Sequence, residues 1–416
     1  MVIYLTNVLG IICEYNPFHN GHLYQLEEAK KACNADFTIA IMSGNFTQRG
    51  DVALFDKWTR AEMALKNGID LVIELPTVYA TSSAENFADG AVKILNSLGI
   101  IDYLAFGSES GDITLLDKIA NILYNEPKEF SALINMQLKS GLSYPKAREL
   151  AVSSYFRGSK QYTEALENPN NILGIEYLKA LKRQKSHIIP ITIKRKDSDY
   201  NSTTAKNGFA SATAIRERLQ NNKNIHRLVP FETYELIEEK LKKKNFLTSL
   251  SIFEKEIIYT LRRMTIEEIA NLPDVTEGLE NKIKFSVSNF TTLDKVIENI
   301  KSKRYTKTRI QRILVYALLG ITKKDMNIAR KTNPYIRVLG FNKHGKNIIS
   351  AIASNNPKLK IIISLKRFLD SNPDNSTKQL LSKDILATNI YTLGLKENPV
   401  ANLDYTHKII EIKSEM

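Results

Sequence analysis

The 416-residue sequence predicts an α/β protein: a Rossmann-like parallel sheet in the first half, then a mainly helical, basic second half that ends in a small α/β part. Three observations support this prediction. Strand-like and helix-like runs alternate over the first 110 residues. Strand signals become rare after about residue 225, and the net positive charge lies beyond residue 220. The length suits two domains, which we place at residues 1–224 and 225–416.

The first half consists of repeated strand–helix units. The expected strands are Val8–Cys13, Phe37–Met42, Leu71–Leu75 and Tyr103–Phe106, and the expected helices are Leu23–Ala32, Lys57–Lys66, Ala84–Leu98 and Ile113–Leu123. Strands separated by single helices form a parallel sheet, whose ligands bind beyond the carboxyl ends of the strands. The loops at that edge, residues 14–22, 43–51, 74–86 and 106–110, carry polar residues and glycines. This pattern is typical of a mononucleotide site.

Periodicity and helix-breaking residues predict the remaining elements. Residues 127–185 are expected to be helical, with a turn at 167–174 that begins the helix through Leu181. Ile188–Arg195 is expected to be the last strand of the first sheet. Helices are expected from about residue 225, followed by a small strand–helix–strand unit with strands at Tyr335–Leu339 and Ile361–Leu365.

The composition is that of an ordinary soluble protein, with 43% hydrophobic and 25% charged residues. No run of about 18 apolar residues occurs, so neither a membrane span nor a membrane partner is expected. Glu14 interrupts the first apolar run and no basic segment precedes it, which argues against a signal peptide. Cys13 and Cys33 are too few for a disulfide framework or a zinc site. These features favour a reducing, cytoplasmic location.

Charge is distributed unevenly along the chain. Residues 1–220 hold 24 basic and 24 acidic side chains, and the remaining residues hold 34 and 21, which accounts for the net charge of +13. A neutral first half beside a basic second half suggests that one part performs chemistry while the other binds a polyanion. No feature implies a protein partner.

The joint between the first strand and the first helix carries His19-Asn20-Gly21-His22, an H-x-G-H motif of nucleotidyltransferases. A helix that begins at such a joint presents backbone N–H groups that favour anions. Gly21 leaves room for close approach, and the imidazoles of His19 and His22 can donate hydrogen bonds to phosphate oxygens. We expect His19 and His22 to be the catalytic residues.

Two further segments have the chemistry of phosphate contacts. Ser211 starts a helix and Arg216 follows one turn later, so both are expected near a phosphate. The segment 301–312 holds six basic residues around Tyr305 and is the leading contact for a nucleic-acid backbone. These basic residues are Lys301, Lys303, Arg304, Lys307, Arg309 and Arg312.

Residues 340–346 match half of a Walker A loop, but we interpret them as a structural turn. Position 347 is Asn, so the hydroxyl that binds Mg²⁺ in the full motif is missing. The segment is also expected to lie far from the first sheet. No cluster with metal-ligand spacing occurs, so no metal site built by the protein is expected.

Six segments in order resemble one bacterial family, the tRNA(Met) cytidine acetate ligases. They are EYNPFHNGH (14–22), SGNFTQRGD (43–51), FGSE (106–109), PNNILGIEYLKAL (169–181), SATAIR (211–216) and KRYTKTRIQR (303–312). The resemblance runs from about residue 8 to about residue 345, and the far C-terminus matches no pattern. One departure is an N-terminal extension of a few residues.

The resemblance implies an enzyme that activates acetate with ATP as acetyl-adenylate, releasing pyrophosphate. It then acetylates the exocyclic amine of the wobble cytidine of elongator tRNA(Met), which gives N(4)-acetylcytidine. Mg²⁺ is expected to accompany ATP, and the second domain is expected to bind the tRNA. The ATP-binding residues implied are Ile12, Cys13, Glu14, Tyr15, Asn16, Pro17, Phe18, His19, Asn20, Gly21, His22, Gln25, Gly107, Asn170, Arg195 and Lys196.

Acetate is expected to bind in a small pocket with one or two hydrogen-bond donors, and Ser43, Asn45 or Arg49 of the second loop are the candidates. The residues identify no general base for acyl transfer. Two alternatives stay open. One is adenylyl or cytidylyl transfer to a small phosphorylated metabolite, which would not need the basic half. The other is a non-catalytic RNA-binding protein, against which the intact histidine motif argues.

Overall fold

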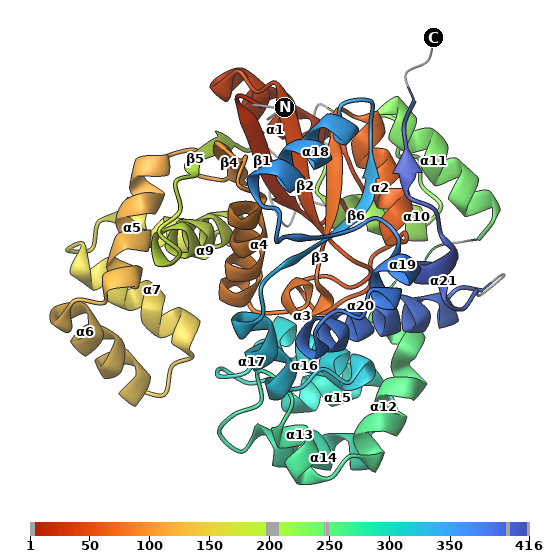
Figure 1. The fold of residues 1–416 in the computed structure, drawn as a ribbon. Helices are drawn as coiled ribbons and strands as arrows, with labels where there is room; N and C mark the ends of the chain where they lie inside the picture. The colour runs from red at the N-terminus through yellow and green to blue at the C-terminus, as the bar shows by residue number, and fades with distance from the viewer. Residues whose placement is uncertain (1–4, 197–207, 245, 247–248, 397–399, 414–416) are drawn as a thin grey trace.

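Figure 1 shows the computed structural model, which describes residues 5–196, 208–244, 246, 249–396 and 400–413. Five parallel strands form one side of its sheet: β1 (Val8–Cys13), β2 (Phe37–Ser43), β3 (Leu71–Leu75), β4 (Tyr103–Ser108) and β5 (Ile189–Lys194). Three later strands, β6 (Tyr335–Phe341), β7 (Lys360–Ile362) and β8 (Ile410–Glu411), belong to the same sheet. The order is β5-β4-β1-β2-β3-β6-β7, with β8 also paired to β6. The predicted α/β class is therefore confirmed.

The helices of the first half largely follow the predicted ranges. The helices are α1 (Asn20–Cys33), α2 (Lys57–Lys66), α3 (Thr77–Ala80), α4 (Ala84–Leu98), α5 (Ile113–Asn125), α6 (Lys128–Lys139), α7 (Tyr144–Tyr155), α8 (Lys160–Glu167), α9 (Pro169–Arg183) and α10 (Ala212–Gln220). The predicted Lys57–Lys66 and Ala84–Leu98 match α2 and α4 residue for residue. The short helix α3 was not predicted.

The second half supplies the remaining helices and extends the sheet. They are α11 (Phe231–Lys242), the 3₁₀ turn η1 (Leu250–Phe253), α12 (Glu254–Arg263), α13 (Ile266–Ala270), α14 (Leu279–Asn289), α15 (Leu293–Ile300), α16 (Lys307–Leu319), α17 (Lys323–Lys331), α18 (Gly345–Asn355), α19 (Leu365–Asp370), α20 (Asn375–Leu393) and α21 (Leu403–Thr406). In Figure 1, α12 to α17 lie together below the sheet, with α20 across their upper edge.

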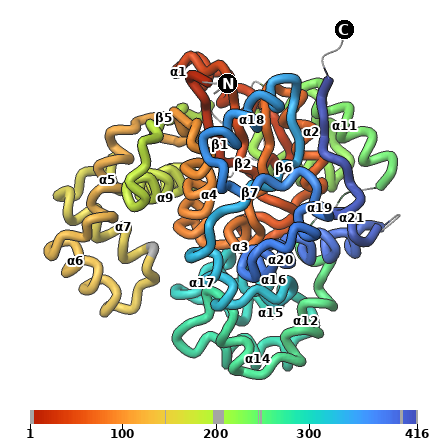
Figure 2. Tube along the Cα trace, in the orientation of Figure 1, coloured from red at the N-terminus to blue at the C-terminus, as the bar shows by residue number. Residues whose placement is uncertain are grey.

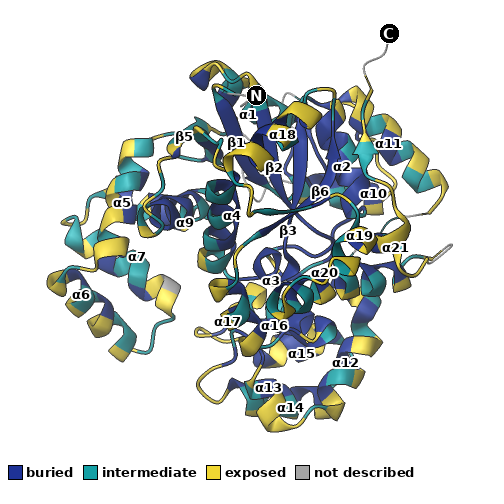
Figure 3. Cartoon of the chain, viewed as in Figure 1, coloured by how far each residue is buried: buried dark blue, intermediate teal, exposed yellow. Residues whose placement is uncertain are grey.

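Side-chain alternation along the strands explains why helices cover both faces of the sheet. Ile39 and Ile41 of β2 pack with residues of α4, α5, α9 and α18. Ala40 and Met42, the residues between and after them, pack on the opposite face with residues of α1, α2, α10 and α11. The central strands are therefore apolar on both sides, and Figure 3 shows them buried beneath helices with exposed outer faces. No helix among the described residues is long and apolar enough to cross a lipid bilayer.

The C-terminal strands correct one expectation. Strand β6 pairs with β3 antiparallel, so the small α/β part is an extension of the first sheet. Figure 2 shows this blue segment beside the strands of the first half. The placement of residues 340–346 far from the first sheet was therefore wrong. The sheet takes strands from both sides of residue 224. The boundary predicted there therefore stays a prediction about function: that the first part performs the chemistry and the second binds the polyanion.

Residues 340–346 nevertheless form a structural turn. Asn342 donates from its amide to a carboxylate oxygen of Asp70 at 2.7 Å, and His344 packs edge-on against Phe37 at the start of β2. Because β6 runs antiparallel, the turn lies at the amino edge of β1 to β5. The carboxyl edge, where the ligand was predicted, is at the other end of these strands.

Candidate active site

A cavity of about 640 Å³ opens at the carboxyl edge of the sheet. Its wall combines the end of β1, the loop after β2, the end of β4, the start of α9, the start of α10 and the first turns of α16. The residues predicted for the site that line it are Ile12, Cys13, Glu14, Tyr15, Asn16, His19, His22, Gln25, Arg49, Gly107, Asn170, Arg195, Ser211, Arg216 and Arg312. The fold thus gathers segments that are up to 300 residues apart in the sequence.

The two histidines of the motif are stacked, with ring centroids 3.7 Å apart and planes at 23°. His19 is the N-cap of α1, and its Nδ1 accepts a hydrogen bond from the backbone N–H of Gly21 at 3.0 Å. The Nδ1 of His22 accepts from the backbone N–H of His19 at 3.3 Å. A neutral imidazole whose Nδ1 accepts carries its proton on Nε2. Both rings are therefore set to donate from Nε2.

Gly21 is required by the ring of His19. A Cβ at this position would lie 2.9 Å from the Cε1 atom of His19, closer than side-chain packing allows. The sequence explained Gly21 by the approach of a phosphate, whereas the structure gives it a role in seating the neighbouring histidine. Any side chain here would push that ring out of its capping position.

Burial keeps both imidazoles neutral. Burial, together with the charges of the nearby Arg195 and Arg216, lowers the pKa of His19 to about 3. Burial also lowers the pKa of His22 well below its usual value, with additional effects from His19 and Arg195. Neutral rings act as directional hydrogen-bond donors at pH 7 and bring no charge of their own.

The end of β4 and the start of α9 are locked together. The Glu109 carboxylate accepts from the backbone N–H of Asn171 at 2.9 Å and from the side chain of Asn170 at 2.6 Å. In return, the Asn171 side chain accepts from the backbone N–H groups of Glu109 and Ser110. Asn170 is one of the partners of Glu109, and Gly107 precedes Glu109 by two residues. These hydrogen bonds, which we call the Glu109 lock, therefore fix two predicted nucleotide contacts relative to one another.

Arg60 is a central positioning residue that the sequence did not reveal. Its side chain is fully buried, and its guanidinium donates to the carbonyl oxygens of Glu14 at 2.6 Å and Ser43 at 3.1 Å, and also to Gly44. It therefore ties the ends of β1 and β2 to each other. An arginine inside a helix gives no local signal of this role.

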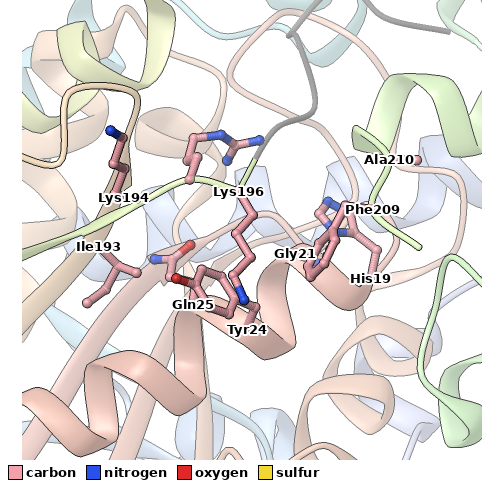
Figure 4. Close-up of a pocket in the computed structure, with 11 residues that line it drawn as sticks. His19, Gly21, Tyr24, Gln25, Ile193, Lys194, Lys196, Phe209 and Ala210 are labelled. Carbon is pink, nitrogen blue, oxygen red and sulfur yellow. Dashed lines mark hydrogen bonds between the residues drawn. The ribbon is translucent and has the colours of Figure 1, made fainter. Parts of the chain in front are cut away.

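A narrow annex adjoins the cavity beside α1 (Figure 4). Gln25, Gly107 and Arg195 line both spaces. Lys196 reaches over the ring of Tyr24, with its Nζ 4.0 Å from the ring centroid. Burial lowers the pKa of Arg195, and the charge of Glu109 opposes that effect. The structure thus places two predicted cations, Arg195 and Lys196, at one end of the site.

Ser211 and Arg216 line the cavity from the start of α10. The Ser211 hydroxyl caps α10 by accepting from the backbone N–H of Ala214 at 3.1 Å. Arg216 donates to the carbonyl oxygen of Asn16 at 2.9 Å and to the Thr213 hydroxyl at 3.2 Å, which are both neutral acceptors. Its positive charge can therefore still meet an anion in the cavity.

Several predicted residues lie behind the cavity wall. Phe18 is fully buried, and the amide of Asn20 donates to the carbonyls of Gly208 and Arg227 at 2.9 Å. Asn45 accepts from the backbone N–H of Lys57 and donates to Thr388, so its side chain is committed to packing. Among the residues predicted to bind ATP, phosphate or acetate, those that line neither the cavity nor the annex are Pro17, Phe18, Asn20, Ser43 and Asn45. Only Arg49 of the three acetate candidates lines the cavity.

The basic segment splits into two parts. Lys301, Lys303, Arg304 and Lys307 are exposed, on the loop before α16 and at its first residue. The other two basic side chains turn inward: Arg309 donates to the carbonyl of Asp274, and Arg312 pairs with the Asp274 carboxylate at 2.8 Å. Gly50, at φ +73°, lies against the backbone of α16, where a Cβ would meet the Arg312 nitrogen at 2.3 Å. This contact fixes the basic segment beside the loop after β2.

No group of three or more His, Cys, Asp or Glu side chains among the described residues is arranged to hold a metal ion.

The strand-to-helix joint with its paired histidines defines an enzyme of the nucleotidyltransferase class. Residues 6–405 match the family model described as HIGH Nucleotidyl Transferase. A tRNA(Met) cytidine acetate ligase of Thermoanaerobacter sp. (strain X514) is 46% identical over 407 residues, which cover 97% of this chain and all of that protein. One of Acetivibrio thermocellus is 44% identical over 414 residues, covering 97% and 99%.

Solved structures agree. The crystal structure of Thermotoga maritima TmcAL bound with alpha-thio ATP has a TM-score of 0.90 at 33% identity, covering 98% of this chain and all of that one. The apo crystal structure of the same protein gives a TM-score of 0.93. The chain belongs to the tRNA(Met) cytidine acetate ligase family, and it is an ATP-dependent ligase. The two alternatives drawn from the sequence are not supported by these relatives.

Proposed function

We propose that this chain activates acetate with ATP and transfers the acetyl group to the exocyclic amine of the wobble cytidine of elongator tRNA(Met). The observation that carries the proposal is the stacked, neutral pair His19 and His22, which lines a cavity at the carboxyl edge of the sheet. A relative of the same fold binds alpha-thio ATP. The relatives' shared name supplies the acceptor and the acyl group.

ATP would bind with its phosphates at the start of α1. The Nε2–H groups of His19 and His22 would donate to phosphate oxygens, and Arg195, Lys196 and Arg216 would balance their charge. Gly107 and Asn170, held by the Glu109 lock, would flank the nucleoside. Cys13, Tyr15 and Asn16 would form the wall of the cavity, because their positions at the end of β1 face it.

The first step needs no nucleophile from the protein. An acetate oxygen attacks the α-phosphorus of ATP, a new P–O bond forms, and the bond to pyrophosphate breaks. The enzyme contributes by positioning the reactants and by stabilising the charge that develops on the phosphates. Mg²⁺, held mainly by the phosphates, would add charge neutralisation. Arg49 is the candidate to bind the acetate carboxylate, since it lines the cavity while Ser43 and Asn45 do not.

The tRNA would approach from the side of α16. The exposed cations Lys301, Lys303, Arg304 and Lys307 suit phosphate contacts, and the helix that follows them lines the cavity. The wobble base would have to leave its stack to reach the acyl group. We also propose a cytoplasmic location, which the two free cysteines fit.

The test is to incubate the purified protein with ATP, Mg²⁺, labelled acetate and bulk bacterial tRNA, then digest the RNA and search for N(4)-acetylcytidine by mass spectrometry. ATP-dependent appearance of the modified nucleoside is the expected result. Acetate-driven ATP–pyrophosphate exchange without modified nucleoside would mean that the acceptor is wrong. Absence of both activities would reject the ligase assignment for this chain.

A further inference from the structure

The cavity contains one carboxylate that the adenylation step does not use. Glu14 follows β1 directly, lines the cavity and is partly buried. The cavity's other glutamate, Glu167, is exposed. A negative side chain beside sites for ATP and acetate repels both anions, so its presence there needs a reason.

Glu14 lines the cavity but not the annex. One of its carboxylate oxygens accepts from the backbone N–H of Gln48 at 2.8 Å, and the other makes no hydrogen bond to any residue the structure describes. Gln48 lines the same cavity, as do Thr308 and Arg312 of α16. None of these residues lines the annex, where Gln25, Gly107 and Arg195 gather. The loop that donates to Glu14 through Gln48 also touches the backbone of α16 through Gly50, so Glu14 lies close to the helix that follows the exposed basic residues.

The chemistry of cytosine matches a carboxylate at this place. Its exocyclic N4 amine is a hydrogen-bond donor, and Glu or Asp is the side chain that accepts from it. The ring is neutral, so a carboxylate next to it carries no electrostatic penalty of the kind that acetate or ATP would impose. The amine is a weak nucleophile and becomes more reactive when a base removes its proton as it attacks.

We propose that Glu14 is the cytidine-facing catalytic residue, which accepts a hydrogen bond from the N4 amine and takes its proton during acyl transfer. The inference rests on the proposed function. The amine nitrogen attacks the carbonyl carbon of acetyl-adenylate, a C–N bond forms, and the C–O bond to the phosphate breaks. AMP leaves with the electron pair of that bond, and the amine proton passes to Glu14 and then to solvent.

A purely structural role for Glu14 makes a different prediction. If its only task were to hold the loop through Gln48, any acceptor of the same shape would suffice. Glu14→Gln keeps an oxygen for the Gln48 N–H and loses the basicity. The negative charge of Glu14 acts on five neighbouring charged or titratable groups: Cys13, Arg49, Arg60, Tyr177 and Arg216. All of them lose this neighbouring negative charge in Glu14→Gln, so the adenylation step has to be measured separately from acetyl transfer.

The experiment compares wild type, Glu14→Gln and the matched control Glu298→Gln, on the exposed face of α15. We measure acetate-dependent ATP–pyrophosphate exchange and, separately, the single-turnover rate of N(4)-acetylcytidine formation from pH 5 to pH 9. For Glu14→Gln we expect acetyl transfer to fall by about 10²- to 10⁴-fold, and by far more than exchange falls. We expect the transfer rate of wild type to fall at acidic pH and that fall to vanish in this variant.

Three outcomes would overturn the inference: normal acetyl transfer in Glu14→Gln, an equal loss of exchange and transfer, or an unchanged pH profile. Normal transfer would show that Glu14 is not catalytic. An equal loss of exchange and transfer would mean that Glu14 serves adenylation or holds the loop. An unchanged pH profile would mean that Glu14 does not accept the amine proton. Failure of the proposed function is distinguishable, because wild type itself would then lack exchange or transfer.

Discussion

Two groups of charged side chains differ in what neutralises them. Four arginines and two glutamates line the cavity, and one of these arginines, Arg312, pairs with Asp274 at 2.8 Å. An anionic ligand in the cavity would meet the positive charge of Arg195 and Arg216. Arg216 reaches only a carbonyl and a hydroxyl, and the carboxylate of Glu109 near Arg195 is occupied by backbone and amide N–H groups. Arg195 and Arg216 are thus held in place without an ion pair to a carboxylate among the described residues.

The second group lies between β3 and β6, where every charge is paired. Lys57 lies 2.8 Å from both Glu74 and Asp404, and Arg337 lies 3.3 Å from Glu74 and also bonds Asp404. Glu74 and Arg337 are direct partners in the antiparallel register. Burial opposes ionisation of Arg337, yet the two carboxylates raise its pKa. These two cations and two carboxylates form the buried ionic cluster.

The contrast separates binding from folding. The charges of the buried ionic cluster neutralise one another, so the cluster needs no ligand. It joins β3 of the first half to β6 and α21 of the second, and it therefore favours this pairing of the two halves over others. An unmatched cluster weakens the protein alone and gains its stabilisation when an anion arrives. The active site is therefore recognised by charges that the protein leaves unpaired, and not by the number of its charged side chains.

The largest expected effect comes from breaking the matched group. Arg337→Met leaves two buried carboxylates to share Lys57, and we expect a loss of about 3–5 kcal/mol in the free energy of unfolding. Urea denaturation measures it. The double variant Arg337→Met/Asp404→Leu removes one charge of each sign and should be more stable than the single variant. A single variant within 1 kcal/mol of wild type would mean that the cluster is not a matched unit.

The next effect comes from the cavity and falls on rate. His22→Ala removes one Nε2–H donor, and we expect acetate-dependent ATP–pyrophosphate exchange to fall by about 10²- to 10³-fold or more. Binding of tRNA should stay within a few-fold, and urea stability should change little compared with the buried cluster variant. His226→Ala, whose ring is exposed beside Tyr234, is the matched control. Parallel loss of exchange and tRNA affinity would indicate misfolding.

Acid should change the free energy of unfolding in opposite directions through one residue in the cavity, His19, and one beside the buried ionic cluster, Asp384. The unfolded chain protonates His19 near pH 6.5 and the folded state only near 3, so stability falls as pH drops, by about 2 kcal/mol near pH 5. Asp384, beside the buried cluster, behaves in reverse. Burial and the nearby Glu74 raise its pKa to about 6, so the folded state takes up its proton first and gains stability as pH drops.

Two substitutions separate these contributions. His19→Asn keeps an N-cap acceptor for α1 and should flatten the loss of stability between pH 6.5 and pH 4. Asp384→Asn keeps an acceptor for the backbone N–H of Thr77 and should make that loss steeper. Urea midpoints measured across this range test both, and slopes that move together would contradict the opposite signs.

The same contrast explains how far the sequence could be read. The strand–helix alternation of the first half is a local signal, and the predicted β1 and β3 match residue for residue. The pairing of β6 with β3 joins residues about 265 apart and leaves no local trace, so the small α/β part was placed outside the sheet. Local periodicity fixes elements, whereas a distant antiparallel partner is known only once the chain has folded.

Site residues show the same limit. His19 and His22 could be found because the motif lies within one turn of chain. Asn45 looked equally suitable as a polar residue after a strand, but its amide is used by Lys57 and Thr388, the latter far along the sequence. Arg60 gave no signal, because its partners are backbone carbonyls. Residue type predicts what a side chain can bind, and only packing decides whether it remains available.

The smallest effect per residue is expected in the exposed part of the basic segment, where the side chains are in solvent and Arg304 lies 3.9 Å from the exposed Glu277. Lys303→Gln with Arg304→Gln removes two exposed cations, and tRNA binding should weaken while the salt dependence of log Kd loses about one unit of slope per lost phosphate contact. Arg309→Gln is the informative comparison, since its guanidinium holds the 274–276 turn through a carbonyl and a hydroxyl. It should lower stability and leave the salt slope unchanged. If the slope responds to Arg309 and not to Lys303 and Arg304, the RNA contacts the inward face of α16, and exposure alone does not define the docking surface.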